Sequence, residues 1–167
     1  RYAILSESRL PDSLLVNNNF DHAILHNINF AGKDLSKSLF REVGLEGSDM
    51  QNTNLSNTTF LQVDFTKIKN KSLAGADLSV ASFEHSNLSG VNISEAIIIG
   101  TSFWKADLSG QDFTVISKAS VVVTVFVEAN LSNSNFEGVD LSPKNIFFKA
   151  FKNKAYLLRG QTQSSET

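Results

Sequence analysis

The side chains that could carry chemistry in this chain are few, and they form no recognisable catalytic or metal-binding motif. Three histidines occur, His22, His26 and His85, and none belongs to a motif such as H-E-x-x-H. Aspartate and serine recur along the whole chain, so their co-occurrence does not single out a catalytic triad. Cysteine is absent, which excludes disulfides, thiolate zinc sites and redox pairs. With no glycine-rich phosphate loop either, the sequence predicts no enzyme activity, no metal site and no cofactor.

Large apolar residues recur at every fifth position, and the fold must explain this period. Between Leu5 and Phe65, all thirteen positions at this spacing are Leu, Phe or Met. A helix would place residues i and i+5 about 140° apart, and a flat strand would place them on opposite faces. The register shifts by three residues after Phe65 and after Phe113, and the period then continues to Ile146. These 28 apolar centres indicate a repeating coil.

Two further preferences accompany the apolar centres. The residue two positions before the centre is Ala, Ser, Thr or Val in 22 of the 28 units. The residue directly before it is Asn or Asp in fifteen units, as in Ala76-Asp77-Leu78-Ser79. Over roughly residues 3–147 this unit resembles the A-[DN]-L-x-x repeat of the pentapeptide-repeat family. The resemblance implies an all-β solenoid, a right-handed quadrilateral β-helix in which each pentapeptide forms one side, with its centre and small residue pointing inward.

Four sides per coil give a period of twenty residues, which makes the threading testable. We treat both register shifts as three-residue insertions at corners. One side then collects six phenylalanines and one isoleucine, as expected when like residues stack from coil to coil. This column is Phe20, Phe40, Phe60, Phe83, Phe103, Phe126 and Ile146. With 28 centres at four per coil, we predict about seven coils.

The end of the chain changes character and divides the sequence into three predicted parts. Residues 1–142 form the β-helix, residues 143–160 form a C-terminal α-helix, and residues 161–167 form a flexible tail. A Ser-Pro pair suits the N-cap and first position of the helix. Residues 143–167 carry five Lys or Arg and one Asp or Glu, whereas residues 1–142 carry ten and sixteen. The helix is predicted to cap the open last coil or to join two copies.

The two insertions depart from the repeat and are candidates for function. The first, Thr66–Ser72, contains Lys67, Lys69 and Lys71. We interpret it either as a solvated corner or as a basic loop that contacts an acidic partner or a phosphate. The second, Thr114–Ser120, is less polar and is suited to fold back on the coil.

Outward positions become apolar on two adjacent sides near the second insertion. Such a surface is not expected to stay exposed to water. Either the C-terminal helix or the second insertion covers it, or it is a dimer or partner interface. Its predicted members are Ile97, Ile99, Trp104, Val122, Val123, Val125, Val127 and Phe147.

Composition narrows the classes of function. The net charge is −2 and no apolar run approaches the ~18 residues of a membrane span, so neither direct nucleic-acid binding nor a membrane span is expected. We expect a non-catalytic interaction or scaffold module from a larger bacterial, effector-like protein, and Arg1 in the first position agrees with an excised domain. The compartment, cytoplasmic or secreted, stays open. A homodimer would form through the C-terminal end or the apolar surface.

The family resemblance also implies an alternative function. Some members resemble B-form DNA in size and charge, bind DNA gyrase and give fluoroquinolone resistance. Those proteins are markedly acidic. Here residues 1–142 reach a net charge of only −6, from ten Lys or Arg and sixteen Asp or Glu, and lysines interrupt the acidic surface. A continuous acidic stripe along one side would favour this alternative, and scattered charges would oppose it.

Overall fold

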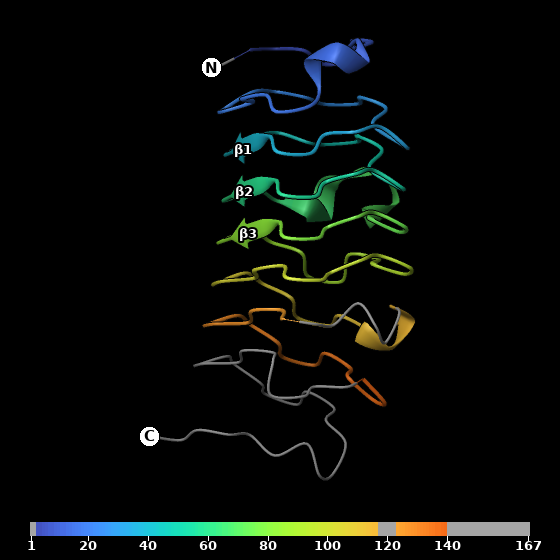
Figure 1. Ribbon diagram of the computed structural model, residues 1–167, viewed down its shortest axis with the longest axis vertical. Helices are drawn as coiled ribbons and strands as arrows, with labels where there is room; N and C mark the ends of the chain where they lie inside the picture. The colour runs from blue at the N-terminus through green and yellow to red at the C-terminus, as the bar shows by residue number, and fades with distance from the viewer. Residues whose placement is uncertain (1–2, 117–122, 140–167) are drawn as a thin grey trace.

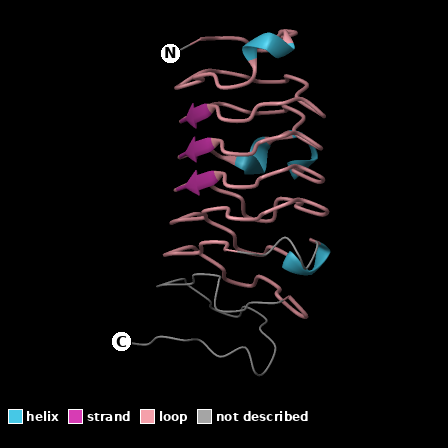
Figure 2. Cartoon of the chain, viewed as in Figure 1, coloured by secondary structure: helices cyan, strands magenta, loops and turns pink. Residues whose placement is uncertain are grey.

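The computed structural model describes residues 3–116 and 123–139, which wind into a stack of similar coils along one long axis (Figure 1). Three short strands, β1 (Leu39–Arg41), β2 (Thr59–Leu61) and β3 (Ser82–Glu84), lie on successive coils and pair in parallel. Most of the remaining described chain consists of turns and single bridges, drawn as loop in Figure 2. The fold is therefore an all-β solenoid.

Backbone pairing shows that a regular coil has twenty residues and four sides. Bridges between successive coils recur five residues apart, at up to four places per coil. Those of one pair of coils are Asn19–Leu39, Ile24–Gly44, Asn29–Asp49 and Asp34–Asn54. Because parallel neighbours lie about 4.8 Å apart, one position on a side forms a straight column of residues along the rod.

The recurring Asn or Asp stabilises the turn at each corner. Its side-chain oxygen accepts a hydrogen bond from the backbone N–H two residues later, as from Ser36 to Asp34 (2.9 Å) and from Ser79 to Asp77 (2.9 Å). The residue three positions after the Asn or Asp, such as Lys37 (φ 61°), adopts a left-handed conformation. Asn and Gly tolerate this conformation best, which explains their frequency at the left-handed position.

The core is a column of stacked phenylalanine rings, as the twenty-residue threading predicts. Ring centroids are 4.8 Å apart between Phe20 and Phe40, and 5.6 Å apart between Phe103 and Phe126. Phe60 and Phe83 stack at 5.0 Å although 23 residues separate them. The predicted positions of both insertions are therefore confirmed. The leucine, isoleucine and methionine centres fill the other sides of the same core.

Polar residues at the small inward position are buried because they bond to the neighbouring coil. The hydroxyl of Thr53 donates to the carbonyl oxygen of Phe30 (3.0 Å), and that of Thr101 donates to Leu78 (2.8 Å). Gln111 is larger, yet its Nε2 reaches the carbonyl oxygen of Leu88 at 2.7 Å. Each bond satisfies a group that would otherwise be costly to bury.

Both insertions begin with the same segment, Asp-Phe-Thr-x-Ile, at residues 64–68 and 112–116. A short 3-10 helix follows each aspartate, η2 (Phe65–Lys67) and η4 (Phe113–Val115). In both, the carboxylate accepts from the backbone N–H and the hydroxyl of the threonine, the latter at 2.6 Å.

The isoleucine that ends each segment is buried in the core. Ile68 is 3% exposed and Ile116 is 5% exposed. The first insertion is thus not a wholly solvated corner, because an apolar side chain anchors it. The lysines around Ile68 remain at the surface, partly in a further 3-10 turn, η3 (Lys69–Lys71). One more such turn, η1 (Asp12–Leu14), lies in the first coil.

Several predictions fall outside the described residues. These are the last coil beyond Val139, and with it the count of about seven coils, the C-terminal helix at 143–160 and the tail at 161–167. Among the helices of the described ranges, none combines the length and apolar character needed to cross a membrane.

We predict that Phe103→Ala lowers the free energy of unfolding by about 3–5 kcal/mol, because the ring is buried between Phe83 and Phe126 and its loss leaves a cavity. Denaturant unfolding followed by circular dichroism measures the change. Glu84→Ala, at an outward position of β3, is the control and should change stability by less than about 0.5 kcal/mol. A loss below about 1 kcal/mol for Phe103→Ala would contradict the stacked core.

Candidate interaction surface

The structure exposes most of the described members of the predicted apolar surface. Ile97, Ile99 and Trp104 are 39%, 42% and 39% exposed, and Val123 is 50% exposed. Val125 and Val127 are half-buried and contribute less. Two further predicted members, at positions 122 and 147, lie outside the described residues.

Sequence reasoning missed one member of this surface, Val80, which is 60% exposed. Its backbone N–H donates to the carbonyl oxygen of Ile99 at 2.9 Å, which places it beside the other members on the preceding coil. Its outward position on the same side as Ile97 and Ile99 was the available signal. We call Val80, Ile97, Ile99, Trp104 and Val123 the apolar patch.

Two valines of the apolar patch have an unfavourable backbone conformation. Val80 (φ 58°) and Val123 (φ 57°) are both left-handed. A β-branched residue is an outlier there, and a left-handed conformation costs an L-residue roughly 1–2 kcal/mol. The equivalent residue on the coil between them is Gly100 (φ 68°), which adopts this conformation without strain. The fold alone would favour Gly or Asn at all three positions.

Charged groups border Trp104, the single tryptophan of the chain. The Lys105 ammonium lies 4.9 Å from the centre of its ring system, and the His85 ring lies 6.4 Å away. Lys105 also faces Glu128 at 3.9 Å. An apolar centre with a polar border is the usual composition of a protein–protein interface.

The candidate basic loop is less available, because ion pairs engage two of its three lysines. Lys69 contacts Asp49 at 2.8 Å, and Lys67 lies 3.9 Å from Asp64. Burial acts to raise the pKa of Asp49, but the Lys69 ammonium and the Gln51 N–H outweigh it and hold that pKa below its ordinary value. This arrangement favours the interpretation of the segment as a structured corner.

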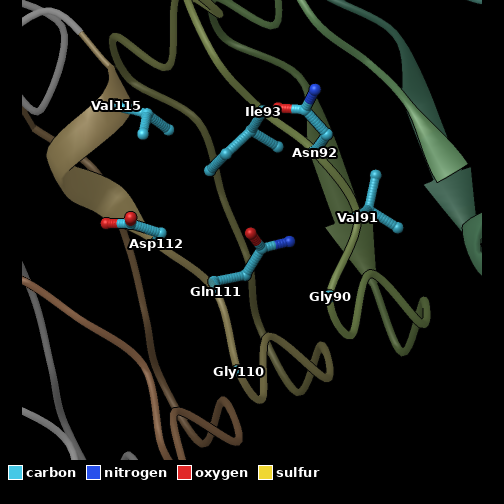
Figure 3. A pocket seen from close by; sticks show the side chains of 8 residues that line it. All are labelled: Gly90, Val91, Asn92, Ile93, Gly110, Gln111, Asp112 and Val115. Atoms are coloured by element: carbon cyan, nitrogen blue, oxygen red, sulfur yellow. The ribbon is translucent and has the colours of Figure 1, made fainter.

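The apolar patch lines neither of two hollows in the described part of the rod. The first is shallow and lies between the turns at Gly90 and Gly110, beside Gln111 and Val115 (Figure 3). Its volume of about 180 Å³ is below the ~300 Å³ typical of small-molecule sites. The second, near the N-terminus, is larger, at about 790 Å³, and is bordered by Lys33, whose ammonium is paired with a carboxylate of the first coil at 2.7 Å.

Within the described ranges, no group of three or more His, Asp or Glu side chains is arranged to hold a metal ion. His22 lies 3.6 Å from the buried carboxylate of Asp21 and 3.7 Å from Glu42. The apolar patch therefore offers a partner apolar side chains that contact can bury.

The strain at Val80 generates a prediction. Val80→Asn should raise the free energy of unfolding by about 1 kcal/mol, because asparagine tolerates the left-handed conformation. Denaturant unfolding measures it. The reverse change at the equivalent position of an earlier coil, Asn57→Val (φ 56°), should lower stability by a similar amount. If Val80→Asn is destabilising, the valine is not strained.

The pair of Asp49 and Lys69 generates a second prediction. The folded state lowers the pKa of Asp49, so the ionised carboxylate stabilises the fold fully above the unfolded pKa of about 3.9. This stabilisation is lost as pH falls through the pKa of Asp49 in the folded state. Lys69→Met should therefore be less stable than wild type at pH 7, by less than about 1 kcal/mol since Lys69 is half exposed, and the difference should shrink towards pH 3. Urea unfolding at several pH values measures this. Lys37→Met is the control, and a difference for Lys69→Met that does not shrink between pH 7 and pH 3 would contradict the pairing.

Comparisons with known proteins agree with this architecture. The sequence matches a family model described as pentapeptide repeats, in eight copies, over residues 19–57, 34–69, 76–114 and 117–142. No curated protein matches the sequence.

Solved structures of similar proteins show the same kind of fold. HetL, a pentapeptide repeat protein involved in heterocyst differentiation regulation in the cyanobacterium Nostoc, is 14% identical with a TM-score of 0.50, over 85% of this chain and 89% of HetL. Full-length QnrB1, a plasmid-mediated fluoroquinolone resistance protein, is 15% identical with a TM-score of 0.39, over 95% of this chain and 92% of QnrB1. Rfr23 from the cyanobacterium Cyanothece is 17% identical with a TM-score of 0.30, over 83% of this chain and 87% of Rfr23.

At 14% identity and a TM-score of 0.50, the likeness to HetL concerns the fold alone, which is of the right-handed β-helix type. The four-sided coils, the inward centres and the Asn or Asp at the corners are the features that the chain shares with the repeat. Because the family model covers more than half of the sequence, the chain belongs to the pentapeptide repeat family.

Proposed function

We propose that this chain is a non-catalytic protein-interaction module and that the apolar patch is its contact surface. The observation that carries the proposal is the exposure of five large apolar side chains on successive coils: Val80, Ile97, Ile99, Trp104 and Val123. Contiguous exposed apolar surface of this kind marks interaction sites in proteins that are otherwise well folded.

The strained valines support the same proposal. Val80 and Val123 destabilise the free coil relative to Asn or Gly, and they are too exposed to compensate by burial within the chain. Residues that reduce stability without contributing to the core are expected where a binding surface needs them. Within this proposal the module is part of a larger bacterial, effector-like protein, and its compartment is either cytoplasmic or secreted.

The alternative, a DNA mimic that binds DNA gyrase, has less support from the charges. A mimic needs a row of carboxylates without neighbouring cations. Here lysines lie beside carboxylates on different coils, at Asp12–Lys33 (2.7 Å), Asp49–Lys69 (2.8 Å) and Glu128–Lys105 (3.9 Å). These pairs interrupt the acidic surface and favour the interaction module.

Trp104→Glu tests whether the apolar patch is an open contact surface. The variant should keep its far-UV circular dichroism and lose no more than about 2 kcal/mol of stability, since Trp104 is 39% exposed and packs only partly against the rod. If the wild type associates in sedimentation equilibrium, the variant should lose that association. Leu61→Glu, at the equivalent position two coils earlier on β2, is the matched control and should leave association unchanged.

A loss of unfolding free energy beyond this limit, without a change in the molecular mass in solution, would show that other residues of the chain cover Trp104. The proposed function would then be wrong. In the wild type, acrylamide should quench the fluorescence of this single tryptophan efficiently when the protein is dilute and poorly when it is associated.

A further inference from the structure

We infer that the hollow near the N-terminus binds an uncharged extended peptide, which pairs with an open backbone edge between Asn29 and Asp34. This site lies at the N-terminal end of the stack, apart from the apolar patch, and does not depend on the function proposed above (Figure 1). The inference follows from a gap in the backbone pairing, from the hollow at this gap and from the charges around it.

Backbone pairing between the first coil (residues 3–20) and the second (residues 21–40) stops after Glu7 and resumes at Asn17. The N–H groups of these two residues donate to carbonyl oxygens of the second coil at 2.9 and 2.8 Å. No bridge or backbone hydrogen bond joins residues 8–16 to the described residues of the second coil. The second and third coils, by contrast, are bridged along the same two sides.

The sequence of the first coil explains this gap. At a regular corner, the Asn29 side chain accepts a hydrogen bond from the Ala31 N–H at 3.0 Å. The residues twenty positions earlier are Arg9 and Pro11. Arginine has no acceptor to offer and proline has no N–H to donate, so the regular corner cannot form there. The chain turns into η1 instead and leaves the second coil without a neighbour.

The second coil therefore presents an open backbone edge. The N–H groups of Asn29 and Asp34 have no acceptor among the described residues, and their carbonyl oxygens accept no hydrogen bond from them. One coil further, the equivalent N–H groups of Asp49 and Asn54 donate to the second coil at 2.9 Å each. An open edge of this kind is a template on which an extended chain can pair.

The hollow lies at this edge and has room for such a chain. Its volume of about 790 Å³ is within the ~300–1,000 Å³ typical of ligand sites. Residues 7–12 line it from the first coil, and residues 27–30 line it from the second. Its apolar lining residues include Leu10, Leu15 and Phe30. A peptide can thus form main-chain hydrogen bonds with the edge and place an apolar side chain against these residues.

The charges around the hollow argue for a peptide that is itself uncharged. The lining contains two acidic residues, Glu7 and Asp12, and two basic residues, Arg9 and Lys33. Lys33 and Asp12 pair with each other at 2.7 Å, from one coil to the other. A strongly charged ligand would meet a like charge in the lining as well as an opposite one. Main-chain pairing has no such conflict.

Nuclear magnetic resonance of the nitrogen-15-labelled wild type tests the inference. The probe is the capped, uncharged peptide Thr-Asn-Leu-Ser-Asn-Thr, which has the sequence of residues 53–58 and one apolar side chain. Titrated to millimolar concentration, it should shift the amide signals of Asn29 and Asp34 and slow their hydrogen exchange several-fold. The amides of Asp49 and Asn54, which are already bonded, should not respond and are the internal control.

Two further comparisons make the test specific. The same peptide methylated at its amide nitrogens should not bind, because it cannot donate to the carbonyl oxygen of Asn29. Ser8→Trp should weaken binding several-fold by filling the hollow, whereas Ser8→Ala, at the same lining position, should bind as the wild type does. Trp104→Glu should also bind the peptide normally, so that this inference and the proposed function can fail separately.

Three results would overturn the inference. Hydrogen exchange at Asn29 as slow as at Asp49 in the free protein would show that the edge is already paired. Equal binding of the methylated peptide would show that main-chain pairing does not hold it. The absence of any shift at Asn29 and Asp34 would show that no such peptide binds in the hollow.

Discussion

Parallel backbone hydrogen bonding between successive coils is the constraint on which the rest of this structure depends. Each regular coil is hydrogen-bonded to the next through its backbone. The N–H of Leu25 donates to the carbonyl oxygen of Gly44, and that of Phe30 donates to Asp49. The spacing of the coils is thereby fixed at the spacing of paired strands. Phenylalanine rings stack at about this distance, so one side of the core consists of a single ring repeated from coil to coil. A residue that disturbs one coil displaces the next.

The same constraint explains how much could be predicted from the sequence. Inward residues must repeat, so the core centres followed from the five-residue period, whereas the twenty-residue coil and the threading of both insertions depended on the four-sided coil that the family resemblance implies. The buried Ile68 and Ile116 followed from neither, because each replaces a small inward residue within an insertion where the period is interrupted. The repeated Asp-Phe-Thr-x-Ile segment was the signal that could have revealed them.

Outward residues are free of this constraint, and prediction was accordingly weaker there. Ile97, Ile99, Trp104 and Val123 were identified because they are apolar at outward positions. Val80 was missed because it stands alone in its unit, and only the stack brings it beside Ile99. Backbone strain at valine is invisible to periodicity, since it depends on the conformation of the corner.

The anchored insertions have a consequence for the evolution and engineering of such rods. After Asp64-Phe65-Thr66 the chain leaves the regular path, with Ile68 buried in the core. Lys67 and Lys69 keep backbone hydrogen bonds to Gly47 and Ser48 of the preceding coil, and the regular bridges resume at Ser72. The coils above and below stay in register, as the stacking of Phe60 on Phe83 shows. The segment therefore accommodates three extra residues without a change of register in the neighbouring coils. Longer loops grafted between Ile68 and Ser72 would give the rod recognition elements at a chosen height while its core stays unchanged.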